Sequence, residues 1–293
     1  MTNTNNNDKY MDWYIQFWDE FISSWFCNHD IYKTGDVFLD NMSMFLSDLM
    51  PEPYLGNPNK GCCSIAILNF NPGYNGDAEE YNQIETIVRY QDGMKYSEVA
   101  LRFPYIQDQK SLSEDCQMYQ NFKGTKWWKN RRIWLDHLVC ASHINNDENL
   151  LPFALELCPW HSKNWDSNRF IKSLENEELK EFVDEHVIKP YIGAISNSLC
   201  GFGVCVGKSF DKVLMSFNFE DVTTGYSKER IESGKGLKLV ESKQRYYRIY
   251  KHQEQGAIVL NTWHEGGNRT PSIEFWPKER DIIQHIVNEL IRK

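Results

Sequence analysis

Two short polar loops contain the residues whose types and spacing best suit chemistry. The first spans 69–75 and has Asn-Pro-Gly at its centre, directly after the apolar run 64–68. Because proline fixes φ and glycine frees it, this loop predicts a sharp turn that presents Asn71 and nearby backbone N–H groups to a cleft. An asparagine there can orient a water through its amide oxygen or bind a planar polar ligand. A plain turn with asparagine side chains capping backbone groups is the alternative interpretation.

The second loop, 261–269, places His264 just after an apolar run and beside two glycines. A histidine at such a point can stabilise the negative charge that develops on a leaving group. A structural histidine with satisfied hydrogen bonds would give the same pattern. Two such loops at the ends of strands of one sheet favour a site over two unrelated turns.

Two other patterns that often carry chemistry fail on inspection. Gly207-Lys208-Ser209 resembles the end of a phosphate-binding loop, but that motif needs glycine at the position of Phe202, and 204–206 reads as a strand. The eight cysteines are scattered without any C-x-x-C pair. We therefore expect reduced thiols, no metal site and no cofactor.

A basic, aromatic segment is a candidate for contact with nucleic acid. Residues 122–132 contain five basic side chains beside Trp127 and Trp128, which cannot share one face of a helix. Basic groups contact phosphates and exposed aromatics stack on unpaired bases, although an ordinary helix with solvated charges is the alternative. The net charge of −9 excludes a global attraction, so any such contact must be local. The candidate nucleic-acid contacts are Lys126, Trp127, Lys129, Arg131 and Lys208.

The elements that must position these loops follow from the hydrophobic pattern. Four short apolar runs suit strands buried on both faces, and helical patterns lie between and after them. This alternation predicts an α/β protein with a parallel sheet, whose ligands bind beyond the carboxyl ends of the strands. The expected strands are 64–68, 151–158, 202–206 and 257–260, and the expected helices are 127–139, 170–187, 211–217 and 277–293.

The N-terminal region predicts a helical extension. Six apolar residues recur there at helical spacing: Tyr14, Phe17, Trp18, Phe21, Ile22 and Trp25. We expect residues 1–50 to form an extension packed on an α/β domain at 51–293. The polar N-terminus does not resemble a signal peptide, and no window has the roughly 18 apolar residues of a membrane span, so a cytoplasmic protein without a membrane partner is expected.

In order and rough spacing, these motifs resemble the uracil-DNA glycosylase superfamily over about residues 50–293. Residues 69–73 resemble its water-positioning motif in the form G-x-N-P-G, with Asn69 in place of the usual Gly. Residues 204–210 resemble its third strand and the following Gly-x-x-Ala turn, with Phe210 in place of Ala. Residues 246–260 resemble its late hairpin, and His264 its His-Pro-Ser loop, although Pro and Ser are absent here.

The resemblance implies a fold, a reaction and a set of roles. The fold would be a three-layer sandwich around a central, mainly parallel four-stranded sheet, here with an extra N-terminal helix. The reaction would be hydrolysis of an N-glycosidic bond, in which Asn71 holds the attacking water and His264 stabilises the departing base. Phe70 would line the base pocket, Tyr74 or Tyr81 would stack on the base, and Glu156 or His161 would read its edge. The expected substrate-binding residues are Phe70, Gly73, Tyr74, Tyr81, Glu156, His161 and Arg269.

The expected partner is DNA, single-stranded or damaged, or a nucleotide-like small molecule. The changed residues at Asn69 and after His264 leave a second function open. A module on the same fold could bind a base or nucleic acid without cleaving it.

Overall fold

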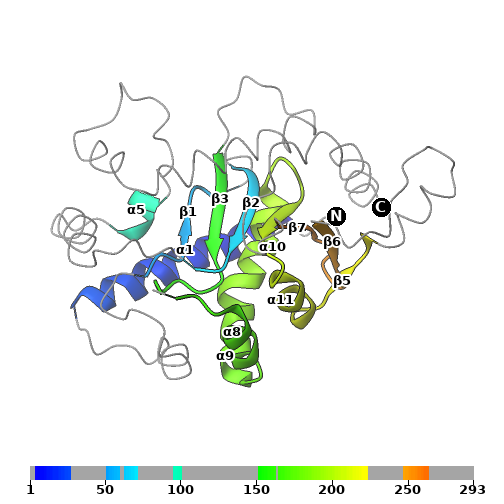
Figure 1. Cartoon of the computed structure of the whole chain (residues 1–293). Coiled ribbons are helices and arrows are strands. Elements are labelled where there is room, and N and C mark those ends of the chain that lie inside the picture. The colour runs from blue at the N-terminus through cyan, green and yellow to red at the C-terminus, as the bar shows by residue number, and fades with distance from the viewer. Residues whose placement is uncertain are drawn as a thin grey trace, which may run out of the picture.

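A seven-stranded mixed sheet forms the centre of this computed structural model, which describes residues 4–27, 51–59, 63–71, 95–100, 151–162, 164–223 and 247–263. The strand order is β1-β3-β2-β4-β7-β6-β5 (Figure 1). The strands are β1 Tyr54–Leu55, β2 Cys63–Asn69, β3 Leu151–Glu156, β4 Gly203–Val206, β5 Phe219–Asp221, β6 Tyr247–His252 and β7 Ile258–Thr262.

The four strands expected from the sequence are the four in the middle of the sheet. Strands β3, β2, β4 and β7 are neighbours in that order and run parallel. The α/β class is therefore confirmed. The expectation of a four-stranded sheet is wrong, because β1 pairs antiparallel with β3 at one edge, and β6 and β5 add antiparallel strands beyond β7 at the other. Strands of two and three residues, such as β1 and β5, are too short to show a period-2 pattern.

The expected helix at 170–187 is several shorter pieces. The chain breaks after α8, where the Asn176 side chain accepts a hydrogen bond from the Leu179 N–H and starts α9. A π-helical turn, η3, then carries the chain from α9 directly into α10. The expected helix at 211–217 is confirmed to within one residue as α11. The helices are α1 Thr4–Cys27, α5 Tyr96–Ala100, α8 Ser167–Ser173, α9 Glu177–Val183, η3 Asp184–Ile188, α10 Lys189–Asn197 and α11 Phe210–Ser216.

One continuous core joins these helices to a single face of the sheet. Side chains alternate along β2, so that Ala66 and Leu68 join the same buried cluster as Ile195 of α10 and Val213 of α11. The side chain of Ile67 faces the other way and is also fully buried. The expected helices at 127–139 and 277–293 lie outside the described residues, so the expected three-layer sandwich stays a prediction.

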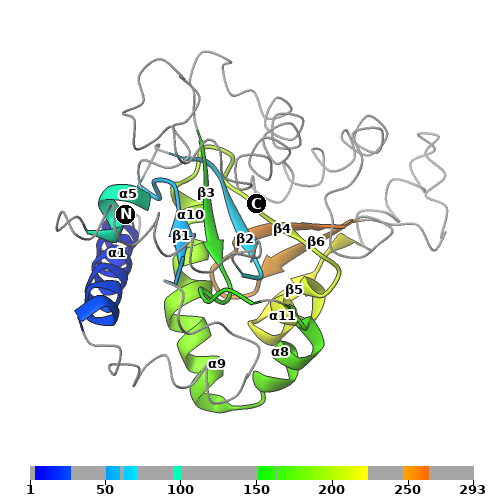
Figure 2. The same ribbon diagram turned by 60° about the vertical axis from the view of Figure 1, so that its left-hand side comes forward.

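The N-terminal helix α1 packs on this core. Met11 of α1 lies against Gly193 of α10, where an added Cβ would be 3.2 Å from the methionine sulfur. Asp19, buried in α1, accepts hydrogen bonds from the backbone N–H (2.7 Å) and the hydroxyl (2.6 Å) of Ser97 in α5. Figure 2 shows α1 and α5 in contact beside β1. Within the described ranges, no helix is long and apolar enough to cross a membrane.

A glycine in β4 sets how closely α10 approaches the sheet. A Cβ on Gly203 would lie 2.4 Å from the Tyr191 hydroxyl oxygen and 2.7 Å from Cδ1 of Ile195. The Tyr191 hydroxyl also lies 3.7 Å from the Cys205 sulfur on the same strand. Any side chain at position 203 would therefore push α10 away from the strand whose end carries the β4–α11 turn.

Gly203→Ala is expected to lower the free energy of unfolding by about 1–3 kcal/mol, because overpacking a buried interface forces the helix or strand to move. Gly193→Ala is the matched control, since its added methyl meets the flexible end of Met11 and alanine favours a helix. Urea denaturation measures both variants. Equal midpoints for the two would contradict the close packing of α10 on β4.

Candidate active site

Because β3, β2, β4 and β7 run parallel, the loops that follow them all leave the sheet at its carboxyl edge, where these strands end. The arrowhead of β3 points in Figures 1 and 2 to the side where α8 and α9 lie. Two further backbone hydrogen bonds extend the β2–β3 ladder at this edge, from the Leu157 N–H to the Asn69 oxygen and from the Cys158 N–H to the Phe70 oxygen, both 2.8 Å. The first residues of both loops are thereby held in a fixed register.

Asn71, the expected water-binding residue, is anchored by the loop after β3. Its amide nitrogen donates a hydrogen bond to the Ser162 hydroxyl at 2.9 Å and lies 3.5 Å from the backbone oxygen of Trp160. The side chain is half-buried, and Ser162 is buried. Because the nitrogen faces these two partners, the amide oxygen of Asn71 is directed away from them. A carbonyl oxygen held in this way is an oriented acceptor for a water or a ligand N–H.

Asn69 and Glu156 form a polar pair across the last register position of β2 and β3. The Asn69 amide nitrogen donates to Glu156 Oε1 at 3.0 Å. Asn69 is only 6% exposed, and its amide oxygen has no donor among the described residues. Asn69 occupies the position at which the resembled motif has glycine, so this chain places a polar side chain where the motif has none.

Phe70 packs on the opposite side of the chain from these polar residues. Its ring stacks on Phe210 with centroids 3.9 Å apart and lies 5.4 Å from the ring of Trp165. Trp165 in turn lies 5.3 Å from Phe170 of α8. This aromatic cluster joins the β2 loop to the starts of α8 and α11. Phe210, which replaces the alanine of the resembled turn, is thus the stacking partner of Phe70.

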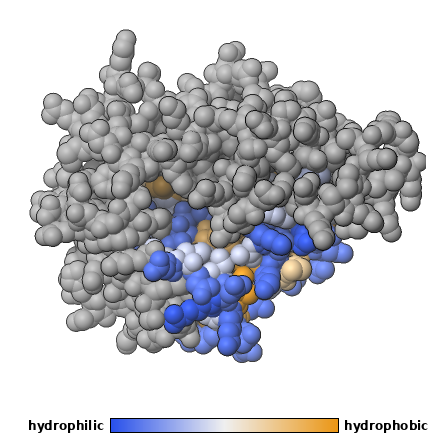
Figure 3. All heavy atoms as spheres, in the orientation of Figure 1, coloured by the Kyte–Doolittle hydropathy of each residue, from blue (hydrophilic) through white to orange (hydrophobic). Residues whose placement is uncertain are grey.

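The turn after β4 is built on a glycine with a positive φ. Gly207 has φ +138°, and its N–H donates to the backbone oxygen of Thr262 at 2.8 Å. This conformation, rarely adopted by residues with a side chain, lets β4 turn sharply into α11. Lys208 is exposed beside it. Figure 3 shows mainly hydrophilic described surface over the region where Figure 1 places α8, α9 and α11.

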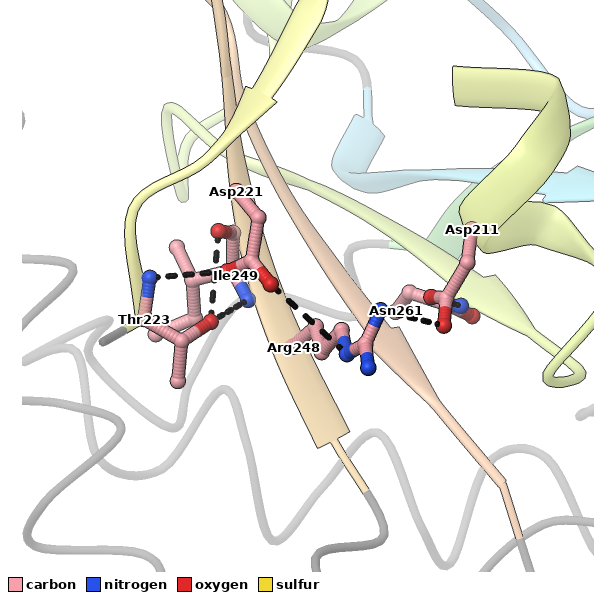
Figure 4. Close-up of polar contacts among 6 residues, drawn as sticks. All are labelled: Asp211, Asp221, Thr223, Arg248, Ile249 and Asn261. Atoms are coloured by element: carbon pink, nitrogen blue, oxygen red, sulfur yellow. Dashed lines mark hydrogen bonds and ion pairs between the residues drawn. The ribbon is translucent and has the colours of Figure 1, made fainter. Parts of the chain in front are cut away.

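A charged network ties α11 to β6 and β7 (Figure 4). Asp211 accepts a hydrogen bond from the Asn261 amide at 2.9 Å, and its other oxygen lies 3.0 Å from an Arg248 nitrogen. Arg248 also lies 3.6 Å from an Asp221 oxygen. Burial raises the pKa of the Tyr250 hydroxyl, on β6, well above its ordinary value. Asp211 lies in the first turn of α11, which follows β4, and Asn261 is the residue before the end of β7. The network therefore holds the end of β7 in place relative to the start of α11.

The remaining expected site residues fall into two groups. Glu156 is half-buried at the end of β3, while His161 is only 1% exposed and lies two residues after the buried Pro159. The others stay predictions, because they lie outside the described residues: Gly73, Tyr74, Tyr81, Lys126, Trp127, Lys129, Arg131, His264 and Arg269.

Two residues of the site were not expected from the sequence as site residues. Asn69 stood out only as a departure from a motif, and Ser162 only as part of a polar loop after a strand. The available signal was their place near the ends of buried strands, since Asn69 is the last residue of β2 and Ser162 lies in the loop after β3.

The described residues contain no group of three or more His, Cys, Asp or Glu side chains that could hold a metal ion. Cys63, Cys158, Cys200 and Cys205 are buried. Burial raises the pKa of the Cys158 and Cys205 thiols. These two side chains are therefore neutral, poorly reactive core residues.

Comparisons of this chain with protein-family models, with curated proteins and with solved structures found no match. Its function must therefore be argued from the residues of the site.

Asp211→Ala is expected to lower the free energy of unfolding by about 2–3 kcal/mol, because it leaves the fully buried Asn261 amide without its acceptor. Asp221→Ala is the control, with an expected loss of about 1 kcal/mol or less. The Asp221 side chain is 29% exposed against 8% for Asp211, so water replaces more of what it loses. Urea denaturation at neutral pH measures both. A larger loss at Asp221 would show that the network does not depend on the buried carboxylate.

Proposed function

We propose that this chain hydrolyses the N-glycosidic bond of a base in DNA or in a nucleotide-like molecule, using a water held by Asn71. The observation that carries the proposal is the anchoring of the Asn71 amide nitrogen by Ser162 and Trp160. An asparagine amide positions a water molecule poorly unless its own orientation is fixed. Here the fixed nitrogen directs the oxygen, which can accept a hydrogen bond from the attacking water and so aim the lone pair of the water at the sugar carbon.

The position of Asn71 in the fold supports the same role. It follows β2, which lies between two parallel neighbours, so loops from three adjacent strands surround it. Ligands of open parallel sheets bind beyond such carboxyl ends. The four central parallel strands and the β6–β7 hairpin also fit the resemblance to the uracil-DNA glycosylase superfamily, and we propose a related fold with added edge strands.

The leaving base needs stabilisation of its negative charge, and His264 is the proposed donor. It follows β7, whose end is held against the β4 turn by the hydrogen bond from Gly207 to Thr262. Donors aimed at a developing negative charge contribute strongly to catalysis. In this proposal Asn71 and His264 act from two strands of the same parallel set.

Base binding without cleavage is the second candidate, and the Asn69–Glu156 pair favours it. This pair is a polar recognition element that does not involve Asn71. A binding module would use it to hold a base while leaving the glycosidic bond intact.

Asn71→Ala is expected to reduce base release by roughly 100-fold or more while leaving the fold intact, since it removes the group that positions the nucleophile. The assay incubates the protein with single- and double-stranded oligonucleotides that carry unmodified, deaminated or alkylated bases, followed by alkaline cleavage. Asn168→Ala, an exposed asparagine on α8, is the matched control and should leave the rate unchanged. Base release that persists in Asn71→Ala would refute the mechanism, and release from none of the substrates would favour the binding module.

Ser162→Ala tests the anchoring itself. Removing the hydroxyl frees the Asn71 amide to rotate, so kcat is expected to fall by roughly 10-fold while KM changes little. Ser162→Thr keeps the hydroxyl and should retain more activity than the alanine variant. An equal loss in both variants would show that packing at position 162, and not the hydrogen bond, is what matters.

A further inference from the structure

A row of side chains crosses the carboxyl edge of the sheet on one face. The register pairs Glu156 with Asn69, Val206 with Thr262, and Thr262 with Tyr247. Val206 follows Cys205, which pairs with Leu68, and so stands beside Asn69. By alternation, these side chains lie on the face opposite Leu68 and Cys205, which belong to the core shared with the described helices.

Two polar atoms in this row are buried without a partner among the described residues. They are the amide oxygen of Asn69 and the hydroxyl oxygen of Thr262, in side chains whose residues are 6% and 0% exposed. Leaving a buried polar atom unpaired costs about 1–3 kcal/mol, and native proteins keep few of them. A pair of them at the ligand-binding edge of a parallel sheet indicates that a ligand supplies the missing hydrogen bonds.

The polarity of the row is defined at the Asn69 end. Because the Asn69 nitrogen donates to Glu156, Asn69 presents its oxygen, and a carboxylate such as Glu156 only accepts. Val206 adds an apolar surface next to them. The Thr262 hydroxyl, which can donate or accept, stands two strands from Asn69, about 10 Å by the usual strand spacing. The row is thus rich in acceptors at one end, apolar in the middle and adaptable at the other end.

From this arrangement we infer that the ligand of the site is a base with an exocyclic amino group, whose N–H donors face Asn69 and Glu156. The inference rests on the proposed function in taking the ligand to be a base. Cytosine and adenine carry such an amino group, and a carboxylate is a favourable acceptor for it. Uracil and hypoxanthine carry a carbonyl oxygen at the same position, which would face the acceptor oxygens of Asn69 and Glu156 and supply no donor to the Asn69 oxygen. The site is therefore selective against the uracil-type edge.

The test measures equilibrium binding of free bases to the full chain by isothermal titration calorimetry, in the pairs cytosine and uracil, and adenine and hypoxanthine. In at least one pair, the amino member is expected to bind 10-fold or more tightly than its carbonyl counterpart, because a polar site rejects a partner that leaves its groups unpaired. This comparison uses the wild-type protein, so it does not depend on whether a variant folds. Equal affinities, tighter binding of the carbonyl members, or no binding of any base at millimolar concentration would overturn the inference.

Glu156→Gln sharpens the test, since the new amide can donate to a carbonyl oxygen. The preference for the amino member is expected to fall at least 10-fold or to reverse. Glu220→Gln, an exposed glutamate on the edge strand β5, is the matched control and should keep the wild-type preference. If a folded Glu156→Gln protein kept the wild-type preference for the amino-bearing base, Glu156 would not be a residue that recognises the base.

Binding of free bases requires no cleavage, so the binding measurement can fail or succeed independently of the cleavage assay that tests the proposed function. Tighter binding of the amino-bearing bases, without base release from any oligonucleotide, would support the inference and refute the proposed hydrolysis. Release of uracil together with equal binding of both members would leave the hydrolase standing and overturn the inference.

Discussion

The parallel pairing of β2 with β3 is the constraint on which the rest of the site depends. These strands are far apart in the sequence, yet their ladder continues beyond the strands through the hydrogen bonds of Leu157 and Cys158 to the β2 loop. That continuation brings Glu156 beside Asn69 and Ser162 beside Asn71. A slip of one residue would exchange the two faces of β2 and send Phe70 to the polar side. The chemistry proposed for Asn71 therefore depends on the register of one strand pair.

The ends of β4 and β7 are held in place by an ionic network and by a backbone hydrogen bond. Asp211 joins α11 to β6 and β7, while Gly207 joins the β4 turn to the last backbone oxygen of β7. Neither contact is part of the proposed reaction. Both restrict where the loop that carries His264 leaves the sheet. A site assembled from four strand ends requires this kind of support, because small displacements of reacting groups cost much of the rate.

The sequence was most informative where burial is continuous. The runs at β2, β3, β4 and β7 are apolar on both faces, so their pattern stands out and the parallel sheet was predictable. The edge strands were not, since β1 has two residues and β5 has three. The break between α8 and α9 was also missed, because it depends on the capping of Asn176 and leaves the hydrophobic spacing almost unchanged. Asn71 was predictable from its turn, whereas the roles of Ser162 and Asn69 depend on contacts between residues 87 to 91 positions apart, which no local pattern reveals.

The packing of α1 has a consequence for how the chain is made. The buried face of this helix, with Met11, packs on α10, about 160 residues later in the chain. At a synthesis rate of about 5–20 residues per second, α10 follows α1 out of the ribosome after roughly 10–30 s. During that interval the part of this helix that packs on α10, which includes Met11, has no native surface to cover it. A chaperone that covered this part of the first helix would protect it until α10 is available.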